Sequence, residues 1–301
     1  MDGRANGTGT LTLRWRLMEE RYVGDMRAGR ANGQGSFVFS TGDKYQGEWR
    51  DGVISGHGTM NWANGDRYEG EWLDGEANGQ GSFAWANGNR YDGEWANSIR
   101  SGHGVSKMTN GDSYDGDWID NLANGQGTLT RGSGERYSGD WRDGKANGQG
   151  TYISANGDRY EGAWADDQRS GLGTLIRANG DRYDGEWRDG KIDGKGTLTW
   201  SNGDRFEGEW HAGLRSGLGT QTFANGGIYY GSWKDNLRSG HGIMRFTNGG
   251  RYTGEWKGDR ADGNGTYVAA NGESSSGIWK NGCLRKDGRT VVAGVAPDTC
   301  K

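Results

Sequence analysis

Residues 67–72 read Arg-Tyr-Glu-Gly-Glu-Trp, and this short stretch decides the fold. Its side chains alternate, with Tyr68, Gly70 and Trp72 on one side and charged residues on the other. An alternation of period two is typical of a β-strand with one packed face and one face in water. The stretch therefore predicts a strand that presents its rings to a shared core.

The same pattern of a ring, a glycine and a tryptophan in alternate positions recurs every 23 residues along the chain. Twelve copies start at residues 22, 45, 68, 91, 114, 137, 160, 183, 206, 229, 252 and 275. The first copy has Met26 in place of the tryptophan, the last has Ser275 in place of the ring, and a half-copy at residues 7–11 precedes them. A fixed period of this length indicates a repeat protein in which each unit packs on its neighbours.

Each copy also contains a second alternating stretch, which follows a Gly-x-Gly motif, as in residues 79–85. Two kinds of turn sequence join the stretches. Asn-Gly, as at residues 64–65, favours a tight type I′ hairpin turn, because both residues tolerate a positive φ. The other connection, as at residues 73–79, is expected to be longer and is also rich in turn formers.

These features predict an all-β fold. We expect a single elongated antiparallel β-hairpin solenoid, or ribbon, of about twelve 23-residue repeats that form one continuous twisted meander sheet. Residues 1–21 are expected to form an N-terminal half-repeat or cap, residues 22–282 the repeat array, and residues 283–301 a C-terminal capping tail. One hairpin buries too little apolar surface to offset the entropy of ordering it, so stability should accumulate with repeat number.

The repeated glycine between the ring and the tryptophan has a packing reason. An inward side chain at that position would prevent the neighbouring rings from closing over the backbone. A bulky substitution such as Gly116→Val is therefore expected to lower the melting temperature.

Composition and charge exclude several classes of protein. The chain has 61 glycines and one proline, but its 15 tryptophans and 13 tyrosines are too many for a disordered segment. The net charge of −4 is spread over interleaved acidic and basic residues, so nothing favours binding to nucleic acid.

The compartment is predicted only broadly. Neither a transmembrane segment nor a signal peptide is visible, so we expect a cytoplasmic or membrane-peripheral protein, or a periplasmic or secreted one if this chain is a trimmed precursor. Cys283 and Cys300 are the only cysteines. They could form a disulfide that staples the tail or remain two free thiols in a reducing compartment.

The full pattern resembles the MORN repeat (membrane occupation and recognition nexus). Tyr-x-Gly-x-Trp-x-x-Gly-x-x-x-Gly-x-Gly followed by Asn-Gly-Asp runs unbroken over residues 45–66 and 183–204, and the resemblance covers about residues 3–282. It implies a ribbon of β-hairpins and a role in scaffolding, oligomerisation or, in some members, lipid association. The C-terminal tail resembles the ends of bacterial MORN proteins. Five residues depart from the pattern by replacing the glycine after the tryptophan, which puts the geometry of those turns in doubt: Ser98, Asn121, Asp167, Asn236 and Asp259.

Polar residues that could carry chemistry are better explained by a solvated face. Two rows of carboxylates, of which Glu69 and Glu71 are examples, lie beside a row of arginines such as Arg67. Alternating charges of this kind are typical of an exposed surface. The four histidines, His57, His103, His211 and His241, belong to separate repeats and cannot converge on one metal. We therefore predict no catalytic residue, no metal, no cofactor and no enzymatic activity.

The aromatic rows leave the main question about function. We expect the Tyr and Trp rows to be mostly core and a second row to be partly exposed, where it could contact a partner or ligand: Phe39, Trp62, Trp85, Trp200, Phe223 and Phe246. The preferred hypothesis is a non-catalytic scaffold that mediates protein–protein interaction or self-association. The alternative is a module that binds glycans or lipid headgroups on aromatic platforms at a membrane or cell envelope.

Overall fold

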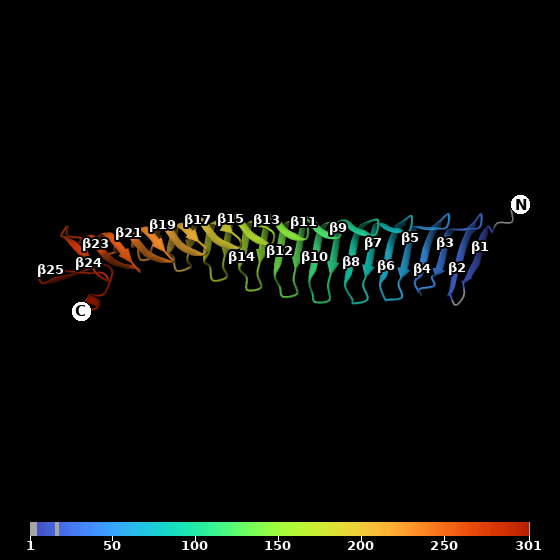
Figure 1. Ribbon diagram of the computed structural model, residues 1–301, viewed down its shortest axis with the longest axis horizontal. Coiled ribbons are helices and arrows are strands. Elements are labelled where there is room, and N and C mark those ends of the chain that lie inside the picture. The colour runs from blue at the N-terminus through green and yellow to red at the C-terminus, as the bar shows by residue number, and fades with distance from the viewer. Residues whose placement is uncertain (1–4, 16–17, 301) are drawn as a thin grey trace. The chain divides into compact units, whose positions relative to one another are not determined.

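The computed structural model describes residues 5–15 and 18–300, and most of them lie in antiparallel β-strands (Figure 1). The chain divides into two compact units, of which unit 1 ends at Gly148 and unit 2 begins at Gln149. Over the described residues, 24 strands belong to the meander. The predicted all-β antiparallel meander of 23-residue hairpins is therefore confirmed.

Unit 1 contains twelve strands within the residues that the structure describes. In each pair of successive strands the second runs antiparallel to the first. They are β1 (Gly7–Trp15), β2 (Met18–Arg27), β3 (Arg30–Val38), β4 (Lys44–Arg50), β5 (Val53–Asn61), β6 (Arg67–Leu73), β7 (Glu76–Ala84), β8 (Arg90–Ala96), β9 (Ile99–Lys107), β10 (Ser113–Ile119), β11 (Leu122–Thr130) and β12 (Arg136–Arg142). The next strand, β13 (Lys145–Ile153), spans the division between the units.

Unit 2 continues the same antiparallel pattern from β14 to β24 and ends in a small separate hairpin. Its strands are β14 (Arg159–Ala165), β15 (Gln168–Ile176), β16 (Arg182–Arg188), β17 (Lys191–Thr199), β18 (Arg205–His211), β19 (Leu214–Thr222), β20 (Ile228–Lys234), β21 (Leu237–Arg245), β22 (Arg251–Lys257), β23 (Arg260–Val268), β24 (Ser274–Trp279), β25 (Cys283–Lys286) and β26 (Arg289–Val292). A short 3₁₀ turn, η1 (Pro297–Cys300), follows.

The two kinds of connection are the reverse of those predicted. The tight two-residue turn follows the strand that contains the repeat's tryptophan. In the repeat that starts at residue 68, Asp74 and Gly75 form this turn between β6 and β7, with φ values of 51° and 85°. Positive φ at both central residues is the requirement of a type I′ turn, and its twist matches that of the flanking strands. The Asn-Gly connection is longer, and the prediction of a type I′ turn there was wrong.

The Asn-Gly loop is held by a side chain that the pattern alone did not reveal. The Trp62 backbone N–H donates to the carbonyl of Asp66, and that of Gly65 donates to the carbonyl of Trp62. Only Gly65 has a positive φ, because the Asn64 side-chain oxygen instead accepts a hydrogen bond from the Asp66 N–H at 2.9 Å. The Asp66 carboxylate accepts from the N–H of Ala86 in the next repeat at 2.8 Å, which ties successive loops together.

The five turns that lack the usual glycine keep the same backbone conformation. Their residues have φ values between 64° and 70°. In four of them the side chain accepts a hydrogen bond from the backbone of the preceding repeat, as when Asn236 Oδ1 accepts from the N–H of Arg215 at 2.8 Å. This bond offsets the cost of a left-handed conformation in a residue that has a Cβ. The doubt about these turns is thereby removed.

Candidate interaction surface

The face that carries the rings is built on pairs of glycines. In the repeat that starts at residue 68, Gly70 of β6 faces Gly81 of β7, and the ring of Tyr68 covers both. A Cβ on Gly70 would lie 2.5 Å from the Cα of Gly81, and one on Gly81 would lie 2.5 Å from the Tyr68 ring. Only glycine lets the ring close over the strands. The Tyr68 hydroxyl donates to the carbonyl of Glu71 at 3.0 Å, and burial raises its pKa.

The tryptophans join one repeat to the next. Trp72 lies edge-on between Tyr45 and Tyr68, with ring centroids 5.6 and 5.0 Å away. Its indole N–H donates to the carbonyl of Gly58 at 3.1 Å, so its one polar atom is satisfied. The same arrangement recurs in both units, for example around Trp256 in unit 2. The Tyr and Trp rows are therefore core.

The second aromatic row lies at the edge of this core. Each of the six predicted contact residues comes directly after the last residue of a strand, and each is half-buried: Phe39, Trp62, Trp85, Trp200, Phe223 and Phe246. In unit 1 the row is joined through Phe83, whose ring lies 5.4 Å from that of Trp62 and 4.7 Å from that of Trp85. Their part in binding a partner stays a prediction.

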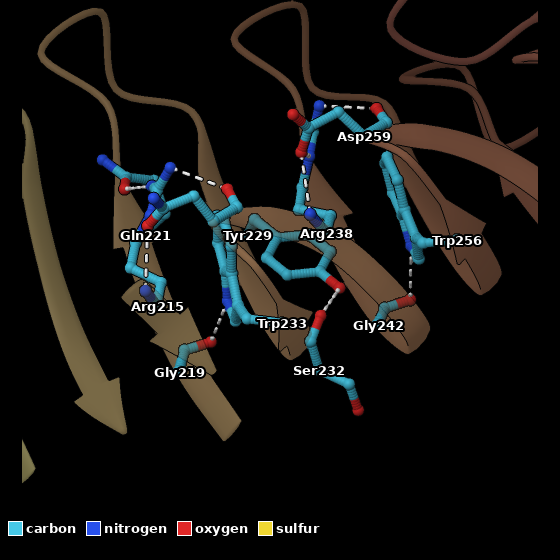
Figure 2. Close-up of polar contacts among 11 residues, drawn as sticks. Arg215, Gly219, Gln221, Tyr229, Ser232, Trp233, Arg238, Gly242, Trp256 and Asp259 are labelled. Atoms are coloured by element: carbon cyan, nitrogen blue, oxygen red, sulfur yellow. Dashed lines mark hydrogen bonds and ion pairs between the residues drawn. The ribbon is translucent and has the colours of Figure 1, made fainter. Parts of the chain in front are cut away.

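Among the described residues, four arginines that lie over rings were not predicted from the sequence. The guanidinium of Arg238 lies over Trp256, 4.5 Å from the ring centroid, and donates to the carbonyl of Asp259 at 2.7 Å. That of Arg215 lies 4.3 Å from the centroid of Trp233 (Figure 2). Such contacts are cation–π interactions strengthened by partial burial. We call these sites arginine boxes, after Arg100, Arg169, Arg215 and Arg238.

The Arg215 box shows how a buried cation is satisfied here. Its guanidinium donates to Gln221 Oε1 and to the carbonyl of Asn236, both at 2.9 Å. Burial lowers the pKa of Arg215 below that of a free guanidinium. Arg215 nevertheless stays charged at neutral pH. The signal that could have revealed the boxes is the tripeptide Arg-Ser-Gly, which replaces Ala-Asn-Gly of other repeats at the same place.

The carboxylate rows have structural partners. Glu71 Oε1 accepts from the N–H of Gln80 at 3.2 Å, where the strand bulges between Gly70 and Trp72. Glu69 in the other row forms an exposed ion pair with Arg67 at 2.6 Å, which contributes little to stability. Within residues 5–15 and 18–300, no group of three or more His, Cys, Asp or Glu side chains is arranged to hold a metal ion.

The C-terminal tail covers the end of the ring face. Ser275 leaves the ring position of the last repeat empty, and Leu284 of β25 lies over Gly277, where a Cβ would be 2.8 Å from its Cδ1. Leu284 is 3% exposed. A disulfide joins Cys283 to Cys300, with Cα atoms 5.8 Å apart.

Shortening Leu284 is expected to loosen this end of unit 2. Leu284→Ala would leave a cavity where other repeats hold a tyrosine ring, and the unfolding free energy should fall by about 2–3 kcal/mol. Urea unfolding followed by tryptophan fluorescence measures the change. Leu214→Ala is the matched control, because Leu214 is exposed. Equal losses for the two variants would contradict a packing role for Leu284.

Among the described residues, no helix has the length and apolar character needed to cross a membrane.

Comparison with known proteins identifies the repeat. A family model described as the MORN repeat matches eleven consecutive segments: residues 22–44, 45–67, 68–90, 91–113, 114–136, 137–159, 160–182, 183–205, 206–228, 229–251 and 252–274. No curated protein matches the chain.

Several solved structures share a general likeness with the chain. The TCP domain of SAS-4 (dCPAP) from Drosophila melanogaster, in complex with a proline-rich motif of Ana2 (dSTIL), is 16% identical over 52% of this chain and 85% of that chain, with a TM-score of 0.33. The TCP10 domain of Danio rerio CPAP, in complex with a peptide of Danio rerio STIL, is 9% identical over 90% of this chain and 100% of that chain, with a TM-score of 0.28.

Proposed function

The chain belongs to the MORN-repeat family, and from this premise we propose that it is a non-catalytic scaffold that binds protein partners on its ring face or associates with itself. The polar residues of the repeat have structural partners of their own. Carboxylates close the strand bulges or pair with arginines, and the turn residues hold the loops. On the ring face, the second-row rings are only half-buried.

The observation that carries the proposal is the half-buried second row in unit 1. Phe39, Trp62 and Trp85 stand on three successive repeats at the edge of a continuous aromatic core. Large aromatic side chains that are rigidly held and partly open are the residues that dominate protein interfaces. A row of them on a repeating sheet offers a partner several equally spaced anchors.

Removing two anchors is expected to weaken partner binding without unfolding the chain. Trp62→Ala combined with Trp85→Ala should reduce the protein retained from native lysate by on the order of tenfold or more. Quantitative pull-down with tagged wild type and variant measures the difference, and circular dichroism checks the fold.

The control variant removes two apolar side chains from the opposite face. Leu172 and Leu218 are 71% and 51% exposed, so Leu172→Ala combined with Leu218→Ala should retain partners as the wild type does. The proposal is wrong if both double variants retain the same proteins. It is also wrong if the wild type retains none and light scattering shows a strict monomer.

The half-buried rings are also the basis of the alternative, a platform for glycans or lipid headgroups. Exposed faces of Trp62 and Trp85 could stack on a sugar ring, whereas the outward carboxylates disfavour anionic bilayers. Tryptophan fluorescence that does not change on titration with glycans or liposomes would remove this alternative.

A further inference from the structure

Unit 2 contains a small pocket on its ring face. Its volume is about 80 Å³, which is less than the 150 Å³ or so that holds a benzene molecule. Trp210 and Tyr183 contribute rings to it, Arg177 and Asp181 come from the neighbouring loop, and Gly213 comes from the turn after the tryptophan. The remaining lining residues are aliphatic: Leu175, Ile192 and Leu198.

Residues that line this pocket occupy the repeat positions of those around the guanidinium in the Arg215 box, one period earlier. In that box the guanidinium contacts three rings, the side-chain amide oxygen of Gln221 and the backbone carbonyl of Asn236, and subtraction of 23 from each residue number gives a residue of the pocket. The pairs are Trp233 and Trp210, Phe206 and Tyr183, Trp200 and Arg177, Gln221 and Leu198, and Asn236 and Gly213. Arg215 itself corresponds to Ile192, whose shorter side chain leaves the guanidinium position empty.

The Arg169 box shows that two rings and one turn carbonyl are sufficient to hold a guanidinium. There the guanidinium lies 4.3 Å from the Trp187 centroid and 5.6 Å from that of Tyr160, and it donates to the carbonyl of Gly190 at 2.9 Å. The equivalents of these three residues in the pocket are Trp210, Tyr183 and Gly213. The two rings and the turn carbonyl are therefore the same in the Arg169 box, which a guanidinium fills, and in the pocket, which is empty.

We propose that this pocket is an open arginine seat, which takes the guanidinium of an arginine side chain presented by a protein partner. The planar cation stacks on Trp210 and donates to the Gly213 carbonyl, as Arg169 does one repeat earlier on its own residues. Arg177 at the rim lies 3.9 Å from the carboxylate of Asp181, which offsets its repulsion of an incoming cation. The inference rests on the proposed scaffold function, because it names the side chain that a partner would use.

The test uses the full chain labelled with ¹⁵N-tryptophan and N-acetyl-arginine amide as the probe. The indole signal of Trp210, assigned from Trp210→Phe, should shift and saturate at a probe concentration on the order of millimolar. N-acetyl-citrulline amide has nearly the same shape without the charge, and it should bind at least about tenfold more weakly. The indole of Trp233 should not move, because Arg215 already covers that ring. An equal response to citrulline, or no shift at Trp210, would overturn the proposal.

Two variants provide matched controls. Ile192→Arg supplies the missing side chain from the chain itself and should abolish the response of Trp210. Arg169→Ala opens the neighbouring box and should create a second arginine-dependent shift, at Trp187. Because Arg169→Ala requires no new packing, it tests the proposal even if Ile192→Arg does not fold. A Trp187 signal that stays insensitive to the probe in Arg169→Ala would count against the seat.

Failure of the seat and failure of the scaffold function give different results. If Ile192→Arg retains the same proteins from lysate as the wild type, and in the same amounts, the seat is wrong while the scaffold function stands. If Trp210 responds to the arginine probe and not to citrulline while no protein is retained, the guanidinium site stands and the scaffold function fails.

Discussion

Gly116→Val is expected to lower the unfolding free energy of unit 1 by more than about 3 kcal/mol and to lower its melting temperature. Gly116 of β10 faces Gly127 of β11, and the Tyr114 ring covers the pair. A Cβ at Gly116 would lie 2.5 Å from the carbonyl oxygen of Gln126 and closer still to the Cα of Gly127. These are backbone atoms held in the sheet, so the valine can be accommodated only if the strands separate or the ring is displaced.

A second glycine separates this steric effect from the general effect of replacing glycine in a strand. Gly9 of β1 faces Gly24, but no ring lies over it, and the nearest atom to a Cβ there is the flexible Met26 sulfur at 3.9 Å. Neither Gly9 nor Gly116 has a positive φ, so backbone strain does not enter the comparison. Gly9→Val should melt within a few degrees of the wild type by circular dichroism. Equal losses for Gly9→Val and Gly116→Val would show that the ring and glycine pair do not control stability.

The meander was predictable because its causes are local. The alternation around Tyr68, Gly70 and Trp72 determines which face is buried, and the 23-residue period places the same face in register from one repeat to the next. Half-burial of the second row also follows from position, since Trp62 and Trp85 come just after the ends of β5 and β7.

The turns were predictable in number but not in type. Asp-Gly and Asn-Gly are both compatible with a positive φ at two successive residues, so composition does not distinguish them. What distinguishes them is a hydrogen bond of the asparagine side chain, whose oxygen accepts from the backbone N–H two residues later, both at Asp66 and at Gly227. At Asp66 the carboxylate adds a bond to the N–H of Ala86 in the next repeat. No pattern within one repeat reveals a bond to the next.

The arginine boxes were not predicted for a related reason. Arg215 enters the ring face from the turn side of β19 and contacts Trp233, which lies on the next strand. A side chain that crosses strands in this way does not change the period-two pattern, so the alternation of rings and charges contains no trace of it. The empty seat at Ile192 becomes visible only when the filled boxes are compared with it, repeat by repeat.

Raising the pH above 10 is expected to unfold the chain through its buried tyrosines. Burial raises the pKa of Tyr45, Tyr91, Tyr160 and Tyr252 to about 12 each, from 10.0 for an exposed tyrosine. The unfolded chain therefore loses these protons first. Their contribution to stability is fully present below pH 10 and is lost as the pH rises from 10 through 12. Far-ultraviolet circular dichroism across this range should show a cooperative loss of strand signal.

Phe206 provides the means to assign that transition to the tyrosines. It holds the ring position of its repeat with 0% exposure and no hydroxyl, so the packing does not require the phenol. Tyr160→Phe combined with Tyr252→Phe should fold at neutral pH, with a modest loss from two missing hydrogen bonds to the carbonyls of Ala163 and Glu255. Between pH 10 and 12 the slope of its unfolding free energy against pH should be smaller by about two protons, because two groups no longer titrate on unfolding. A slope equal to that of the wild type would mean that other groups drive the alkaline transition. The buried phenols would then contribute to packing alone.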